Sequence, residues 1–569
     1  MRNLIINLSE NCVGCNRCVR VCPIDEANIS RLIGGDVKVE VDSSKCISCG
    51  ACISACHHGA RQYEDDTERF FSDLKSGVPI SVFAAPAFKT NFNDWERMLT
   101  WLRQLGVREI HDVSLGADIC TWAHIRYIQK HGANPIISQP CPAIVNYVLL
   151  HKNELVKKLS PVHSPMLCSA VYMKKYANVN TRIAALSPCI AKTHEFEATG
   201  LAEYNVTFKK LQEYMDSHRI SLPVQSSGFD HYDSGLGSLY PMPGGLKENV
   251  EYYIGKALRI DKSEGPDVVY KALDEYAIQP VNALPAVFDV LNCAEGCNLG
   301  TGCIHNKNVF DMNTSMDSAR KNSIREDKRQ YLDELFEEFD RTLRLEDFIR
   351  HYKPLPTRRI QVSQEAIKKI YEALGKHDEA GRTFDCGACG CDTCHEMVLR
   401  IAKGLDIPGN CVDKAHKDVQ REHAEAKANL SNFEYILTDT ANTKELTEGI
   451  VSNIKDITDA ITAYNKMVME IEKIAMQINI ISLNASIEAA RAGTAGRAFS
   501  VVAEEIRTLA TRSAESAKQT KDTSVKATGA ISSVNEMIVK ISASVNASYD
   551  NISAIAENTR KFFAEEGAG

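Results

Sequence analysis

Cysteine is the residue with the most evident chemistry in this chain of 569 residues, which contains 20 of them. Eight cysteines form two runs near the N-terminus, and each run has the spacing C-x2-C-x2-C-x3-C. Thiolates at such short intervals are typical ligands of iron–sulfur clusters or zinc. Because the chain is large and carries no export signal, we expect these thiols to bind metal and not to form disulfides.

The two runs resemble those of bacterial ferredoxins that carry two [4Fe–4S] clusters. In such ferredoxins the fourth cysteine of each run ligates the other cluster. Paired zinc sites are the alternative, but they leave the tandem repeat unexplained. Residues 1–77 are therefore the predicted ferredoxin-like 2[4Fe–4S] domain. The resemblance implies one cluster on Cys12, Cys15, Cys18 and Cys56, and a second on Cys46, Cys49, Cys52 and Cys22.

Three later segments carry single cysteines in distinctive contexts. Cys141 lies between two prolines, Cys189 lies three residues before Lys192, and Cys293-x3-Cys297 is followed by two glycines. Together these segments resemble the three signature segments of [FeFe] hydrogenases. Residues 78–355 are accordingly the predicted α/β H-cluster domain of two lobes.

The hydrogenase resemblance implies a cofactor and a set of ligands. Cys141, Cys189, Cys293 and Cys297 would hold the [4Fe–4S] part of an H-cluster, with Cys297 bridging to a two-iron unit that carries CO and cyanide. Lys192 would donate a charge-assisted hydrogen bond to a cyanide. Hydrogenase maturation proteins, H2 and a ferredoxin-like electron carrier are the implied partners.

Departures from the family pattern fall where the family handles protons. Pro140 stands at the position of the proton-donating cysteine, and proline has no exchangeable side-chain proton. His124 lies near the positions of the relay glutamates and titrates near neutral pH, although a lone histidine is more often structural. Cys120 and Cys168 are expected to be buried small hydrophobes. These departures predict a site that binds hydrogen and turns it over slowly.

A further cysteine set follows a predicted linker at residues 353–356. Its spacing, C-x2-C-x4-C-x16-C, resembles a small [4Fe–4S] domain found beside corrinoid and electron-transport proteins. Zinc remains the alternative metal, because four thiolates suit either. Residues 356–420 are the predicted small [4Fe–4S] domain and a candidate transmitter, with Cys391 as a spare. The implied ligands are Cys386, Cys389, Cys394 and Cys411.

Residues 421–569 have a heptad pattern in each of two arms. One seam runs through Ile454, Ile457, Ile461, Tyr464, Val468, Ile471, Ala475 and Ile478, and the other through Ile531, Val534, Ile538, Ile541 and Val545. The stretch between the arms resembles the tip of methyl-accepting chemotaxis receptors, which docks a histidine kinase and its coupling protein. We expect a long antiparallel hairpin that forms a four-helix coiled coil in a homodimer. The predicted tip residues are Asn484, Glu488, Arg491, Arg497 and Phe499.

Composition sets the remaining limits. With 44% hydrophobic and 25% charged residues, a net charge of -8 and no basic tract, the chain is expected to be a multidomain α+β protein without nucleic-acid partners. No apolar run reaches the ~18 residues that a membrane span needs. We therefore expect a cytoplasmic protein that does not enter membranes.

These features predict a low-turnover [FeFe] hydrogenase that acts as a sensor of hydrogen or redox state, with an H-cluster and three additional [4Fe–4S] clusters. Two alternatives stay open. One is a turnover hydrogenase linked to ferredoxin, whose hairpin only dimerises. The other is a non-catalytic iron–sulfur protein that lacks the two-iron unit.

Overall fold

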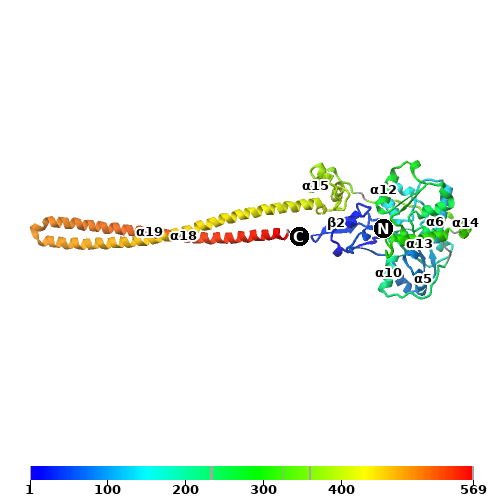
Figure 1. Ribbon diagram of the computed structural model, residues 1–569, viewed down its shortest axis with the longest axis horizontal. Coiled ribbons are helices and arrows are strands. Elements are labelled where there is room, and N and C mark those ends of the chain that lie inside the picture. Colours follow the sequence, from blue (N-terminus) through cyan, green and yellow to red (C-terminus); the bar gives the residue numbers. More distant parts are fainter. Residues whose placement is uncertain (1, 231–234, 325, 356, 358–359, 567–569) are drawn as a thin grey trace. The chain divides into compact units, whose positions relative to one another are not determined.

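The computed structural model describes residues 2–230, 235–324, 326–355, 357 and 360–566. The chain forms two compact units, residues 1–415 and residues 416–569. In Figure 1 the first unit is a mixed body of helices and strands, and the second consists of two long helices. Pro356, at the end of the predicted linker, lies outside the described residues.

The N-terminal region has the ferredoxin-like fold expected from the sequence. Strand β1 (Ile5–Asn7) pairs antiparallel with β4 (Arg61–Tyr63), and β2 (Asn28–Ile33) pairs antiparallel with β3 (Asp36–Val41). Two short helices, α1 (Arg17–Arg20) and α2 (Ala51–Ser54), carry the third cysteine of each run. Each helix begins after a residue in the left-handed region, Asn16 and Gly50, which turns the cysteine loop back toward the helix.

Two parallel sheets form the framework of residues 78–355, which confirms the predicted α/β domain of two lobes. The first sheet has the order β6-β5-β8-β9, with β5 (Ile80–Ala84), β6 (Ile110–Asp112), β8 (Arg182–Ser187) and β9 (Tyr204–Thr207). The second has the order β10-β11-β7, with β7 (Ile136–Ile137), β10 (Ile260–Glu264) and β11 (Val287–Leu291). Strands β5, β9 and β11 are buried along their whole length, as parallel strands covered on both faces must be.

Helices cover both sheets. Helices α6 (Val113–His131) and α8 (Pro165–Lys175) pack against each other, and both are buried over most of their length. The other helices of this region are α3 (Thr67–Lys75), α4 (Ala87–Asn91), α5 (Trp95–Gln104), α7 (Pro142–His151), α9 (Lys192–Thr199), α10 (Phe208–Ser217), α11 (Gly245–Ile254), α12 (Pro266–Ile278), α13 (Val309–Ser323) and α14 (Glu326–Thr342).

A small helical domain closes the first unit. Helix α15 (Gln364–Ala373) packs on α17 (Cys394–Ala402), and the one-turn helix α16 (Glu379–Arg382) lies between them in the sequence. Its core combines Ile367, Leu374 and Val398 with three cysteines, Cys389, Cys391 and Cys411. The core is small, and a bound metal cluster would add to its stability.

The second unit is an antiparallel hairpin, as the heptad pattern predicts. Helix α18 (Val412–Arg491) and helix α19 (Arg497–Glu566) are joined by a short turn at Gly493–Gly496 (Figure 1). Buried positions recur every seven residues in both arms. They are Thr447, Ile454, Val468, Ala475, Ser482 and Ala489 in α18, and Ala503, Ala510, Ala517, Ser524 and Ile538 in α19, while Ala556 is buried outside this register.

The predicted seam divides into a buried and an exposed half. In α18 the residues three positions after the buried ones stay exposed, at 49% for Ile457, 46% for Tyr464, 51% for Ile471 and 38% for Ile478. In α19 the same register leaves Ile506, Val534, Ile541 and Ile555 exposed. One hairpin therefore uses half of its heptad residues and presents the other half as an apolar stripe.

No helix among the described residues combines the length and the apolar character needed to cross a lipid bilayer.

Candidate functional site

A cavity of about 720 Å³, including the space open to solvent, lies at the carboxyl ends of the strands of both sheets. Ala85 follows β5, Val113 follows β6, and Pro188 follows β8, while the second sheet contributes Pro140 after β7 and Asn292 after β11. Loops at the carboxyl ends of parallel strands are the usual place for a ligand in an α/β fold. The topology thus assembles one site from segments that are far apart in the sequence.

The four cysteines of the hydrogenase-type segments line this cavity together. Burial, and then the neighbouring thiols, raise the pKa of Cys189, Cys293 and Cys297 to about 12 each. Cys141 is among the neighbours that raise all three pKa values. Because iron binds thiolates, loading the site must release protons. The role of these cysteines as ligands stays a prediction.

Two glycines let the Cys297 loop approach the Cys189 loop. A methyl group at Gly302 would stand 2.9 Å from the carbonyl carbon of Pro188 and 3.0 Å from the backbone nitrogen of Cys189. At Gly300 it would stand 2.5 Å from the carbonyl oxygen of Pro188. The backbone N–H of Gly302 donates to that same oxygen at 2.8 Å. The glycines therefore bring the two thiols to one cavity.

The wall of the cavity is largely apolar and rich in proline. Its prolines are Pro86, Pro140, Pro142, Pro165, Pro188 and Pro241, and aliphatic side chains such as Leu291 fill the spaces between them. Proline has no backbone N–H, so these residues donate no hydrogen bonds to a ligand. Four thiols in an apolar wall suit a metal cluster whose other ligands are small and carry their own charge.

Lys192 is the one positively charged residue among the described residues that line the cavity. It is buried, and its ammonium donates to Glu195 Oε2 at 2.6 Å and to Ser164 Oγ at 3.1 Å. An ammonium group has three donors, so one remains for a ligand in the cavity. Glu195 also lies 3.9 Å from the Arg350 guanidinium. The predicted hydrogen bond from Lys192 to a cyanide stays a prediction.

Pro140 lines the cavity, whereas His124 does not. His124 is fully buried in α6, where Nδ1 lies 2.8 Å from the carbonyl oxygen of Cys120 and Nε2 lies 2.9 Å from Ser160 Oγ. Side-chain contacts connect His124 to the cavity through Cys120, because the Cys120 thiol contacts both the His124 ring and the hydroxyl of Tyr240. Tyr240 in turn lines the cavity.

Cys120 and Cys168 are buried, as predicted, but they are not simple hydrophobes. Both thiols lie 3.3 Å from the carbonyl oxygen of His163, and they hydrogen-bond to each other. Burial alone would raise the pKa of Cys120, but the hydrogen bond from Cys168 and the charge of the His124 ring outweigh it and lower the pKa. Burial and the Cys120 thiol raise the pKa of Cys168. The sequence gives no signal for this pairing, which depends on α6 packing against α8.

A second cavity, of about 330 Å³, is lined by the four thiols assigned to the second ferredoxin-type cluster, Cys22, Cys46, Cys49 and Cys52. Tyr270 lies near both cavities. Burial raises its pKa, and the charges of Cys49 from the second cavity and of Cys141 and Cys293 from the central one add to the increase. The Tyr270 hydroxyl donates to Asn292 Oδ1 at 2.6 Å, and Asn292 Nδ2 lies 3.9 Å from Cys293 Sγ. These contacts connect the surroundings of the two cysteine sets.

The remaining N-terminal set surrounds the first turn of the ferredoxin-like domain. Burial raises the pKa of Cys18, the thiols of Cys12 and Cys15 add to this, and Arg61 opposes it from 3.6 Å. The backbone N–H of Val39 donates to Cys12 Sγ at 3.4 Å. Cys56 is half-buried just after α2. Hydrogen bonds to sulfur of this kind tune the potential of a bound cluster.

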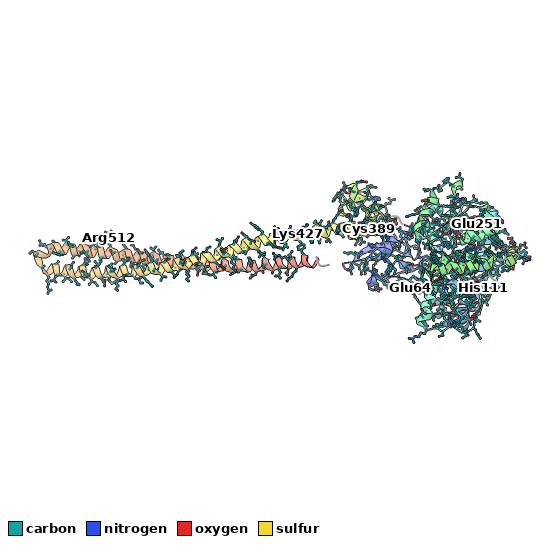
Figure 2. The ribbon with its side chains drawn as sticks, in the orientation of Figure 1. Glu64, His111, Glu251, Cys389, Lys427 and Arg512 are labelled. Carbon is teal, nitrogen blue, oxygen red and sulfur yellow. The ribbon has the colours of Figure 1, made fainter. Side chains whose placement is uncertain are left out.

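Five cysteines line a cavity of about 320 Å³ in the small domain, where Figure 2 shows Cys389. They are the predicted ligands and Cys391, so the placement of Cys391 does not set it apart as a spare. The Cys391 thiol lowers the pKa of Cys389 through a hydrogen bond. Among the described residues, no three Cys, His, Asp or Glu side chains lie close enough together to hold a single metal ion.

Arg400 joins the small domain to the ferredoxin-like domain. Its buried guanidinium donates to the carbonyl oxygens of Asp25 and Asn28, the latter at 2.8 Å, and pairs with Asp406 at 3.3 Å. Lys403 adds an ion pair with Glu26 at 2.8 Å. No sequence pattern singles out these residues, because their role depends on contacts between segments far apart in the chain.

The predicted tip residues lie on either side of the turn between α18 and α19. All five are exposed: Asn484, Glu488, Arg491, Arg497 and Phe499. Phe499 is 76% exposed, and Glu488 and Arg491 face each other at 3.7 Å. An exposed aromatic ring among charged groups is typical of a protein-docking surface.

Three segments of the chain match models of known protein families. Residues 4–57 match a 4Fe-4S dicluster domain, and residues 78–300 match the C-terminal domain of the iron-only hydrogenase large subunit. Residues 393–565 match the signalling domain of methyl-accepting chemotaxis proteins. The chain therefore combines an iron-only hydrogenase domain, a dicluster domain and a chemoreceptor signalling domain. The combination predicted from the sequence is confirmed.

Individual relatives match shorter parts. A probable chemoreceptor of Sinorhizobium fredii is 28% identical over 237 residues, which are 38% of this chain and 30% of that protein. The methyl-accepting chemotaxis citrate transducer of Salmonella typhimurium is 49% identical over 74 residues, 13% of this chain and 14% of that protein. The chain thus spans less than a third of the length of these curated relatives. A solved structure of a variant of [FeFe]-hydrogenase HydA1 from Chlamydomonas reinhardtii is 13% identical, with a TM-score of 0.39, and covers 51% of this chain and 99% of that one.

The close approach of the two cysteine loops gives a first prediction. Gly302→Ala should lower the stability of the first unit by about 1–3 kcal/mol, because the added methyl group pushes the Pro188–Cys189 peptide away from the Cys297 loop. It should also lower the iron bound per chain after reconstitution. Gly228→Ala is the matched control, since nothing lies within 4 Å of a methyl group there. Thermal unfolding and iron analysis measure both effects, and equal iron content in the two variants would contradict the prediction.

Proposed function

We propose that this chain is a hydrogenase-like sensor of hydrogen or redox state, and that its output is the chemoreceptor-type hairpin. The central cavity supports the input: four thiols, one buried cation and an apolar wall suit an H-cluster. The hairpin supports the output, because its exposed tip carries the residues that resemble the kinase-docking tip of chemoreceptors. A histidine kinase and its coupling protein are the proposed downstream partners.

The residues of the cavity have separate roles in this proposal. Cys141, Cys189, Cys293 and Cys297 hold the H-cluster, which when bound supplies the interconversion of H2 with protons and electrons. Lys192 directs its remaining N–H into the cavity, and Glu195 and Ser164 orient the ammonium. The proline-rich wall excludes water, which strengthens each hydrogen bond in the cavity. Three further [4Fe–4S] clusters on the other cysteine sets carry electrons, and a ferredoxin-like protein is the proposed external carrier.

The presence of Pro140 in the cavity wall favours a sensor over a turnover enzyme. It lines the cavity at the position where the resemblance places a proton-donating cysteine, and it has no proton to give. Tyr240 is a hydroxyl donor in the wall, and its contact with Cys120 connects it to His124. Burial and the Cys120 thiol keep the pKa of Tyr240 well above its usual range, so its hydroxyl releases a proton reluctantly. Slow proton delivery would keep hydrogen bound long enough to be reported.

A sensor must change its output when it meets its ligand. Full-length protein matured with the two-iron precursor should show different deuterium uptake in residues 416–566 under H2 and under argon. The same protein without the precursor is the control and should show no difference. Infrared bands of CO and cyanide confirm that the two-iron unit is present. Identical uptake under both gases, with those bands intact, would rule out hydrogen as the signal.

The missing thiol gives a test of turnover. Pro140→Cys should raise hydrogen evolution from reduced methyl viologen by about 10²–10⁴-fold, the usual contribution of a positioned acid or base. Pro140→Ala is the control: it removes the ring but adds no proton donor, so its rate should stay near that of the wild type. If Pro140→Cys brings no gain while its infrared bands are those of the wild type, proton delivery at this position does not limit turnover.

We also propose that two chains associate through the exposed half of the heptad seam. Ile457, Ile471 and Ile478 form an apolar stripe on α18, and Ile541 and Ile555 continue it on α19. A second hairpin would cover both stripes and complete a four-helix coiled coil. Such stripes are rarely left open to water.

The stripe predicts the result of two neighbouring substitutions. Ile471→Lys should convert the dimer to a monomer, because it places a charge in the proposed interface. Met469→Lys is the matched control, because Met469 is 50% exposed and Ile471 is 51% exposed. Met469 lies outside the heptad seam, so this substitution should leave the dimer intact. Light scattering of the full chain gives the mass. Dimers of equal stability in both variants would show that the stripe is not the interface.

A further inference from the structure

Lys376 is a charged residue in an unusual place. It follows α15 in the small domain and is only 1% exposed. Its ammonium donates to Asp413 Oδ2 at 3.1 Å and to the carbonyl oxygen of Gly381 at 3.0 Å, and it also hydrogen-bonds to the thiol of Cys394. Among the described residues that line the five-cysteine cavity, Lys376 is the one cation.

Asp413 belongs to the first turn of α18. That helix begins at Val412, directly after Cys411, and both Val412 and Asp413 line the cysteine cavity. A carboxylate in the first turn also stabilises the helix through the positive end of its dipole. Lys376 therefore contacts one predicted cluster ligand and the start of the output helix with the same ammonium group.

The loop before Cys411 is held by other contacts. Asp406 accepts from Asn410 Nδ2 at 2.6 Å and from the backbone N–H of Ile407 at 2.9 Å. Arg400 ties Asp406 to the ferredoxin-like domain. Asp406 and Arg400 do not line the cysteine cavity, although their charges act on the thiols of Cys389 and Cys391. They hold the loop through its contacts with the ferredoxin-like domain. Lys376 joins the cysteines to α18 through a charged side chain, whereas the other contacts, from Lys414 and Ala415 to Cys411, are made by the backbone.

We propose that Lys376 is the positioning residue that links the charge on the Cys386–Cys411 set to the first turn of α18. The role rests on the proposed [4Fe–4S] cluster at these cysteines. Reduction by one electron from a low-potential carrier adds one negative charge beside Lys376, and no bond forms or breaks. The ammonium then shifts toward Cys394, its hydrogen bond to Asp413 weakens, and the first turn of α18 loosens. Oxidation restores the Lys376–Asp413 bond.

Asp385 does not compete for this role. Its carboxylate accepts from the backbone N–H of Cys394 at 2.5 Å, and its own N–H lies 3.4 Å from Cys394 Sγ. Both bonds fix the Cys394 loop and neither reaches α18. Asp385 also carries a negative charge, so the electron added on reduction would repel it. Unlike Lys376, its carboxylate donates no hydrogen bond to Asp413 that reduction could weaken.

The test uses the full chain, reconstituted with iron and sulfide and without the two-iron precursor. In the wild type, reduction by dithionite should raise deuterium uptake in residues 412–420. In Lys376→Met, which keeps the length of the side chain and removes its charge, uptake should be the same in both redox states. Lys369→Met is the matched control, because this lysine of α15 is 69% exposed in its side chain and pairs with Glu365. It should respond as the wild type does.

The midpoint potential of the cluster separates this role from a merely structural one. Lys376→Met should lower the potential, since a buried positive charge that favours reduction is lost, whereas Asp413→Asn should raise it. Both variants should lose the redox-dependent uptake. Lys376→Arg keeps the charge and should keep both the response and the potential. A response that persists in Lys376→Met, or one that is lost in Lys376→Arg at full iron content, overturns the role of Lys376.

The outcome is independent of hydrogen sensing, because no H2 and no two-iron unit are present. If the electron paramagnetic resonance spectrum of the reduced wild type is unchanged by Cys394→Ser, no cluster occupies this set. That result overturns the proposed cluster and the role of Lys376 with it. An altered spectrum together with an unaltered uptake response in Lys376→Met overturns the role alone.

Discussion

The structure depends on bringing cysteine thiols together in places that exclude water. Without metal, the thiols of the central cavity resist ionisation, and burial raises the pKa of three of them to about 12. Thiolates in such a place repel each other and need compensating positive charge. The fold therefore has to hold the loops in position and to supply cations. The parallel sheets and the close contact at Gly302 hold the loops in position.

Buried cations supply the positive charge, and Arg61 serves both N-terminal cysteine sets. Arg61 lies by Cys18 and lowers the pKa of Cys46 and Cys52, although burial outweighs it there. Lys192 serves the central cavity, and Lys376 serves the small domain. Each cation also has an oxygen partner: Val39 for Arg61, Glu195 for Lys192 and Asp413 for Lys376. A change of charge at the cysteines would therefore act on a cation that also makes a hydrogen bond to the surrounding protein.

Local patterns in the sequence predict local structure well. The two cysteine runs predict the ferredoxin-like domain, and the heptad period predicts both arms of the hairpin. The central cavity is different, because Cys141, Cys189 and Cys293 have unremarkable spacing and come together only through the topology of two sheets. Their grouping could be inferred from resemblance and not from distance along the chain. Arg400 and Lys376 left no signal at all, since a buried lysine looks like a surface lysine in the sequence. For the same reason Cys120 was expected to be apolar.

In the proposed function, protons and electrons would reach the central cavity through different contacts. On one side, Tyr270 and Asn292 connect Cys293 to the surroundings of the second ferredoxin-type set. On another, Tyr240 borders the cavity in front of Cys120 and His124. The electron side consists of close contacts between buried groups, whereas the proton side begins at a hydroxyl with a raised pKa and has proline where a thiol would serve. In the proposed sensor, an input site built in this way would equilibrate electrons faster than protons. The redox state of the chain would then follow its electron partners quickly and hydrogen slowly, which suits a sensor better than a catalyst.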